Sequence, residues 1–289
     1  MEGNAVQALK RGVCPGNYPS SVIMEGNAVQ AKGKMMPLKI RIHLSGNPSA
    51  NPYQHSNGLQ ALFYSWLKRS SSSLASQVHD ANQSKPFSIS PINYMKTPGS
   101  ECFFDVSILT DWLASPVLDG LTASADAVRL GNEYYNHLGY EVVQRSEWQE
   151  MLECSRIKTD FPFNILTPVA HHAPGQWRKS IVVPSPERYF GSWLNRWNSC
   201  SQLAIPDEIV EIFAGPMVVS DFSGCTEVVR LEKGRTFIGY AGNVKFKVLE
   251  PDALSADTFK YLQALARFAC YCGTGVDTSR GMGQTAYMG

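Results

Sequence analysis

The most distinctive chemistry in this sequence is near its C-terminus, where residues 273–283 read GTGVDTSRGMG. Two Gly-x-Gly pairs are separated by five residues and place glycines at Gly273, Gly275, Gly281 and Gly283. Glycine allows positive φ and close backbone approach, and successive exposed amides can form a nest for an anion. Arg280 adds a guanidinium that forks onto phosphate, and Ser279 adds a hydroxyl. The segment therefore predicts a phosphate-binding loop; the alternative is a flexible connector before the last strand.

Other chemical motifs are excluded by their spacing. The glycine segment lacks the Gly-Lys-Ser/Thr of a P-loop and does not follow a strand as a dinucleotide-binding loop must. His171 and His172 are adjacent, so a strand would direct them to opposite faces. The cysteines are scattered without a CxxC pair, which is not the pattern of a zinc site or a disulfide framework. We therefore expect no metal and no cofactor.

The composition is that of a globular protein. The chain has 289 residues, a net charge of +1, 18% charged residues and 44% hydrophobic residues. This excludes a wholly disordered chain, and no apolar run approaches the roughly 18–20 residues of a membrane span. Scattered cysteines and the lack of a secretory signal predict a cytoplasmic protein with no membrane partner.

The first 35 residues are predicted to lie outside the fold. MEGNAVQA occurs at 1–8 and again at 24–31, and two copies are too few for a stacked repeat. We interpret residues 1–35 as a disordered leader; a basic arm is the alternative. Without them the chain has 22 Lys/Arg and 23 Asp/Glu, so nucleic-acid binding would depend on a local patch.

Two similar halves follow, and they must position the glycine segment. In residues 36–145, alternating apolar residues predict a strand, and apolar residues at helical spacing predict a helix after Asn57. The expected elements are a strand at 37–44, that helix, a second helix from the serines at 70–73, strands at 86–92 and 101–110, a helix at 111–128 and a strand at 134–143. Residues 146–289 can be divided similarly: a strand at 161–170, a helix after Pro184, strands at 216–221, 226–231 and 236–249, a helix at 256–272 and a strand at 284–288. The order β-α-β-β-α-β is ferredoxin-like. We place the boundary near 144–158.

With these elements in place, the chain resembles a known family. The Gly-x-Gly-x5-Gly-x-Gly segment is similar to the C-terminal loop of the RAMP superfamily. Residues 52–90 and the blocks FNILTPVA (163–170) and SPERYFGSWLNRWN (185–198) resemble its CRISPR-associated repeat-processing endoribonucleases. The resemblance implies an α+β fold of two tandem ferredoxin-like (RRM-like) domains, the first carrying the catalytic residues and the second the glycine-rich loop. It also implies metal-independent cutting of CRISPR precursor transcripts within the repeat, leaving 2′,3′-cyclic phosphate and 5′-hydroxyl ends.

The same resemblance implies three catalytic residues, Tyr64, His79 and Lys85. The chemistry is reasonable, because RNA self-cleavage needs a deprotonated 2′-hydroxyl and a protonated leaving oxygen, and free histidine titrates near about pH 6.5. Lysine stabilises developing negative charge, and a tyrosine hydroxyl can orient the nucleophile. The requirement for a 2′-hydroxyl excludes DNA as a substrate.

Each of these residues also has a structural interpretation. His79 could simply lie at a helix C-terminus, where a cation is favourable. Tyr64 could be a half-buried core residue, and Lys85 a solvated lysine before a strand. His55, just before the first helix, is the rival catalyst.

RNA is expected to be held by dispersed basic residues. Phosphate contacts position RNA and make its affinity depend on salt. The candidates are Arg178 in a loop and Arg230, Lys233 and Arg235 around a hairpin tip at Gly234. The expected partners are CRISPR repeat RNA and CRISPR effector-complex proteins. Two other functions stay open: a non-catalytic RNA-binding subunit of an effector complex, and a scaffold for protein partners.

Overall fold

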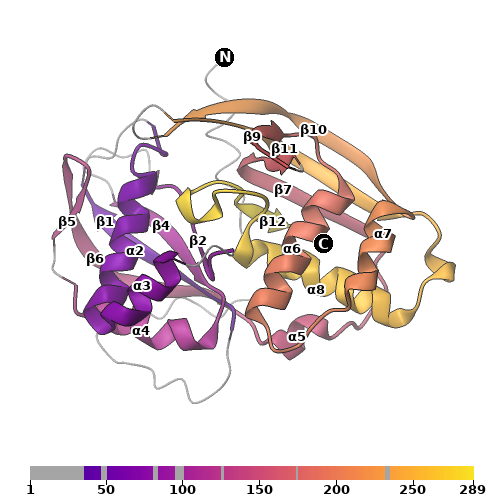
Figure 1. The fold of residues 1–289 in the computed structure, drawn as a ribbon, viewed down its shortest axis with the longest axis horizontal. Helices are drawn as coiled ribbons and strands as arrows, with labels where there is room; N and C mark the ends of the chain where they lie inside the picture. Colours follow the sequence, from indigo (N-terminus) through magenta and orange to yellow (C-terminus); the bar gives the residue numbers. More distant parts are fainter. Residues whose placement is uncertain are drawn as a thin grey trace.

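The structure is a computed structural model that describes residues 36–46, 51–80, 84–94, 101–124, 127–173, 175–231 and 235–289. The predicted leader, residues 1–35, lies outside this range, as does the predicted hairpin tip with Lys233 and Gly234. The two halves of the chain lie side by side, each a sheet with helices packed on one face (Figure 1). Within the described residues no helix is long and apolar enough to cross a membrane.

The N-terminal half is built on an antiparallel sheet with the strand order β2-β4-β1-β6-β5. Its strands are β1 (Leu38–Ser45), β2 (Phe87–Ile89), β3 (Asn93–Tyr94), β4 (Glu101–Ile108), β5 (Ala127–Leu130) and β6 (Glu133–Arg145), and its helices are α2 (Ser56–Ser70), α3 (Ser72–Asp80) and α4 (Asp111–Thr122). In β1, buried and half-buried residues alternate, because successive strand residues point to opposite faces. Ile40 and Ile42 face the core together with Phe63 and Trp66 of α2.

The C-terminal half repeats this plan with the order β10-β11-β7-β12. Its strands are β7 (Asp160–Val169), β8 (His171–Ala173), β9 (Gln176–Ile181), β10 (Met217–Arg230), β11 (Thr236–Val248) and β12 (Thr285–Tyr287), and its helices are α5 (Trp148–Leu152), α6 (Pro186–Cys200), α7 (Val210–Ala214) and α8 (Ala256–Cys272). In both halves the first strand is central: β1 lies between β4 and β6, and β7 lies between β11 and β12. That is the strand arrangement of a ferredoxin-like fold, so the predicted fold of two tandem ferredoxin-like domains is confirmed.

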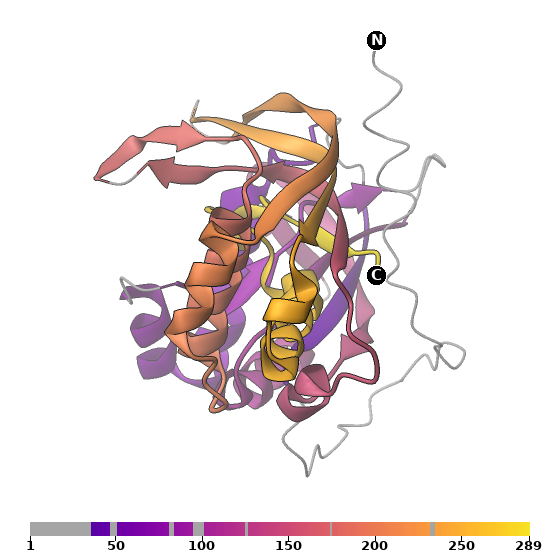
Figure 2. The ribbon, with the colours of Figure 1, turned by 90° about the vertical axis from the view of Figure 1, so that its right-hand side faces the viewer.

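Several predicted boundaries are wrong. The helix expected at 111–128 ends at Thr122, and residues 127–130 form β5, which pairs with β6 through a turn at Gly131 (φ +62°). The two short strands expected at 216–221 and 226–231 are one strand, β10, paired with β11 along its length. Arg178, expected in a loop, lies in β9, which forms a separate hairpin with β8 beside the β10–β11 ribbon (Figure 2).

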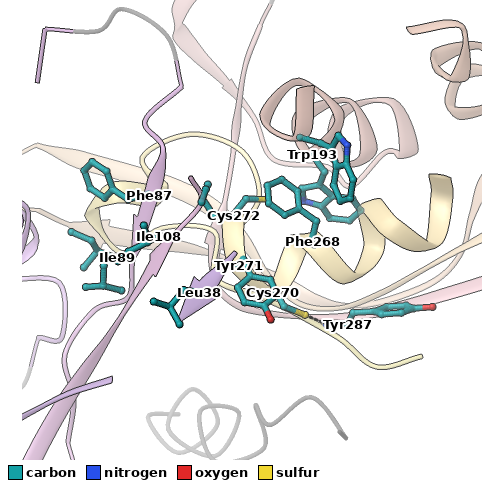
Figure 3. Close-up of a cluster of buried hydrophobic side chains, with 14 of the residues drawn as sticks. Leu38, Phe87, Ile89, Ile108, Trp193, Phe268, Cys270, Tyr271, Cys272 and Tyr287 are labelled. Carbon is teal, nitrogen blue, oxygen red and sulfur yellow. Dashed lines mark hydrogen bonds between the residues drawn. The ribbon is translucent and has the colours of Figure 1, made fainter. Parts of the chain in front are cut away.

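One continuous core joins the two halves. Phe87, Ile89 and Ile108 of the N-terminal half belong to the same buried cluster as Phe268 and Tyr271 of α8 (Figure 3). The last carbonyls of a helix have no partner within the helix, and here side chains from both halves bond to them. These are Lys39 Nζ to the Cys270 oxygen at 2.6 Å, Ser88 Oγ to the Tyr271 oxygen at 2.6 Å, and Arg196 Nη1 to the Cys272 oxygen at 2.6 Å. The end of α8, where the glycine-rich segment begins, is therefore fixed to two strands of the N-terminal sheet and to α6.

Candidate functional site

Tyr64, His79 and Lys85 come together at the end of α3. Tyr64, on α2, meets the His79 ring edge-to-face, with ring centroids 5.2 Å apart. Lys85 comes just before β2, and its Nζ donates to the backbone oxygens of Val78 at 2.9 Å and His79 at 2.6 Å. The ammonium therefore caps the C-terminus of α3, where a cation is favourable.

The three side chains differ in exposure, which decides what each can do. The His79 side chain is 67% exposed, and its Nδ1 lies 2.9 Å from Asp80 Oδ1, so its other ring nitrogen is left toward solvent. Burial raises the pKa of Tyr64, with Arg280 opposing and Asp80 adding to the rise. The phenol therefore stays protonated at neutral pH and is suited to donate a hydrogen bond. Burial lowers the pKa of Lys85, an effect that Asp80 opposes and Arg280 reinforces.

The glycine-rich segment lies against α2, the helix that carries Tyr64. Arg280 Nε donates to Gln60 Oε1 at 3.2 Å, and Gln60 Nε2 donates to Ser279 Oγ at 2.9 Å. Gln60 is one turn before Tyr64 on α2, so the two side chains share a helix face. Arg280 thus lies close enough to influence the pKa values of both Tyr64 and Lys85.

The glycines shape this segment, but most of their amides do not form the expected open nest. Gly273, Gly275, Gly281 and Gly283 all have positive φ, between 68° and 94° for the set. A Cβ on Gly275 would overlap the Ala170 oxygen. The amides of Gly273, Gly275 and Gly283 are donated to the Ala269 oxygen, Ser192 Oγ and the Pro168 oxygen. These three amides serve the shape of the loop, which leaves the side chains of Ser279 and Arg280 as the candidates for phosphate binding.

Two predicted RNA-binding arginines share one carboxylate that the sequence analysis missed. Asp277 has a left-handed backbone (φ 56°), and its oxygens lie 2.7 Å from Arg235 Nη2 and 3.0 Å from Arg280 Nη1. Aspartate is among the few residues enriched in this backbone region, so its place between two glycine pairs was a usable signal. Arg230 is exposed on β10, and its carbonyl accepts from Asn51 Nδ2 at 3.1 Å.

His55, the alternative candidate for the catalytic histidine, lies in another part of the N-terminal half. The His55 side chain is only 3% exposed. Its Nε2 lies 2.8 Å from Glu133 Oε2 and 3.1 Å from the Tyr135 hydroxyl. These contacts join the start of α2 to the β5–β6 hairpin. Among the described residues, no three His, Cys, Asp or Glu side chains gather as a metal-binding group.

Two ferredoxin-like units with a glycine-rich segment between the last helix and the last strand are the features expected from the resemblance to the RAMP superfamily. The expected family resemblance is confirmed: residues 163–285 match the family model of the CRISPR-associated endoribonuclease Cas6.

Solved structures share the fold over most of the chain. A Thermus thermophilus Cas6 product complex has 24% identity and a TM-score of 0.76, covering 89% of this chain and 100% of that one. A second Cas6 product complex has 22% identity and a TM-score of 0.71, covering 87% and 100%. A Cas6-related protein from Pyrococcus furiosus has 12% identity and a TM-score of 0.56, covering 88% and 99%. No curated protein sequence matches the chain.

Proposed function

We propose that this protein cuts CRISPR precursor transcripts within the repeat. The 2′-hydroxyl attacks the adjacent phosphate, leaving a 2′,3′-cyclic phosphate and a 5′-hydroxyl. The observation that carries the proposal is the contact of Tyr64 with the exposed His79 ring, with Lys85 bonded to the His79 backbone. The Cas6 family match and the likeness to Cas6 product complexes support repeat RNA as the substrate.

The three side chains divide the chemistry among them. His79 exchanges a proton with the reacting oxygens, because its free ring nitrogen faces solvent. Lys85 and Arg280 place positive charge where the phosphorane becomes negative. Tyr64 donates a hydrogen bond that orients the ribose or the phosphate. Because protein groups supply the acid, the base and the charge, we expect cutting to continue in EDTA.

The test uses a labelled RNA carrying the CRISPR repeat of the genome that encodes the protein. In EDTA the wild type should cut this RNA once per repeat, and a single 2′-deoxy nucleotide at the cut site should block cutting. His79→Ala should reduce the single-turnover rate about 10²–10⁴-fold and keep RNA affinity. Lys85→Met should reduce the rate about 10²–10³-fold.

Two other histidines serve as comparisons. His43 lies on the face of the N-terminal sheet opposite the helices, so His43→Gln should cut like the wild type. His55→Gln should lower stability but keep cutting. If His55→Gln abolished cutting while His79→Ala did not, the catalyst would be misassigned. RNA that is bound but never cut by the wild type would instead indicate a non-catalytic subunit.

A further inference from the structure

A cavity of about 320 Å³ adjoins the candidate catalytic residues. Its lining residues come from the end of α3, the segment just before β2, the start of α4 and the end of α6, so both halves form its wall. Val78 and Pro86 line it, and they are the neighbours in sequence of His79 and Lys85. A group bound in this cavity would therefore contact the last turn of α3, whose Val78 and His79 carbonyls are bonded to Lys85.

The wall of the cavity combines an exposed aromatic ring with an unsatisfied hydroxyl. Trp112, in the first turn of α4, is 54% exposed, which is unusual for a tryptophan. Thr110 is 4% exposed, and its Oγ1 is buried without a hydrogen-bond partner in the described part of the chain. Buried polar groups normally have a partner, and leaving one unpaired is costly. Because Thr110 lines the cavity, rotation of its side chain would turn this hydroxyl toward a ligand with a polar edge.

The charge of the lining indicates which part of a nucleotide fits. The residues that line the cavity are all uncharged, and Gln77 adds an amide able to donate and to accept. Phosphate is better served by the nearby Lys85 and Arg280. A flat, neutral ring with hydrogen-bonding edges matches the cavity, and RNA-binding proteins recognise unstacked bases by aromatic stacking and edge contacts.

We propose that this cavity holds one unstacked nucleobase of the repeat RNA, from a nucleotide adjoining the cleaved linkage. Trp112 stacks on the face of the base, and the Thr110 hydroxyl and the Gln77 amide bond to its edge. The inference rests on the proposed function and adds a subsite to it. Binding there would pull one nucleotide out of the RNA stack and hold the linkage beside His79.

The test combines protein variants with abasic RNAs. Repeat RNAs with a single abasic site at each position around the cut are cleaved under single-turnover conditions by the wild type, Trp112→Ala and Trp112→Phe. With intact RNA, Trp112→Ala should raise the half-saturating RNA concentration about tenfold, and Trp112→Phe should keep most of the affinity. One abasic position should cause a similar loss in the wild type and no further loss in Trp112→Ala. Thr110→Val should show a several-fold loss that disappears with the same abasic RNA.

Tyr134→Ala is the matched control, because Tyr134 is 69% exposed on β6, away from the cavity. It should leave the half-saturating RNA concentration and the single-turnover rate unchanged, and each abasic RNA should cause the same loss in it as in the wild type. Additive losses for Trp112→Ala at every position would overturn the subsite and leave the cleavage activity standing. A wild type that cuts no repeat RNA would overturn the proposed function and the subsite with it. If Trp112→Ala melts at a lower temperature, the other two variants still test the subsite. Trp112→Phe should keep most of the RNA affinity, and the loss in Thr110→Val should disappear with one abasic RNA; a Thr110→Val loss that stays the same with every abasic RNA would overturn the subsite.

Discussion

Gly120 of α4 lies against the backbone of α2. Replacing it with alanine should lower the stability of the protein, although alanine is the better helix former. A Cβ at this position would overlap the backbone oxygen and carbonyl carbon of Trp66 in α2. These are backbone atoms, so no side-chain rotation can relieve the overlap, and the two helices must separate. Gly120→Ala should therefore destabilise the fold.

The magnitude follows from two opposing effects. Alanine improves helix propensity over glycine by about 1 kcal/mol. Overpacking costs about 1–3 kcal/mol or more, and overlap with backbone atoms belongs at the upper end. We expect Gly120→Ala to lower the free energy of unfolding by a net 1–2 kcal/mol, approximately. Gly191 of α6 is the matched control, because an added Cβ there meets nothing within 4 Å. Gly191→Ala should raise the free energy of unfolding by about 0.5–1 kcal/mol.

The assay is urea unfolding followed by tryptophan fluorescence and far-ultraviolet circular dichroism. Because α2 also carries Tyr64, the cutting rate of Gly120→Ala should fall as the helices separate, and that of Gly191→Ala should not. A Gly120→Ala protein as stable as Gly191→Ala would refute the reasoning, since the contact with α2 would then be loose enough to admit a methyl group.

Two further predictions concern charge. The pKa of His171 is lowered to about 4, mainly by burial and further by Arg188 and His172. The unfolded chain therefore takes up this proton first as the pH falls from about 6.5 toward 4. Roughly 3 kcal/mol of stability should be lost over that window. The loss should be smaller in His171→Gln when thermal unfolding is measured as a function of pH, and equal slopes for the two proteins would contradict this. For Arg280→Ala, the slope of log affinity against log salt, measured by RNA titration, should decrease by about 1. It should stay unchanged for Lys260→Ala, an exposed lysine paired with Asp257, and equal slopes would exclude Arg280 from phosphate contact.

The regular elements were predictable because their residues repeat with a clear period. The apolar alternation of β1 and the long apolar helix at 256–272 both appear as expected. The prediction was wrong where a pattern was short or mixed. The four residues of β5 are too few for a period to emerge and gain their order only by pairing with β6. In β10, the residues in the middle are exposed and mostly polar, a pattern that in sequence indicates a turn. The pairing with β11 shows that the strand continues through them.

The candidate site could be predicted from the sequence only in part, because some of its features form between segments that are far apart in the chain. Tyr64, His79 and Lys85 were named from family resemblance, and their positions on α2, at the end of α3 and just before β2 bring them together. The cavity beside them could not be foreseen, because Val78 and Cys200 come from different halves. Nor does sequence show that the amide of Gly275 bonds to Ser192 on α6. Such long-range contacts convert an apparent anion nest into a packed loop.

The three side chains that hold the carbonyls of α8 have a consequence for motion. Lys39, Ser88 and Arg196 arrive from three different elements and meet at one helix end. Opening the molecule like a hinge between its halves would break the bonds from Lys39 and Ser88 to α8, whereas Arg196 lies in the same half as α8 and would move with it. Under the proposed function, we therefore expect RNA to be accommodated by its own bending or by movement of the long β10–β11 ribbon, while the root of the glycine-rich loop stays still.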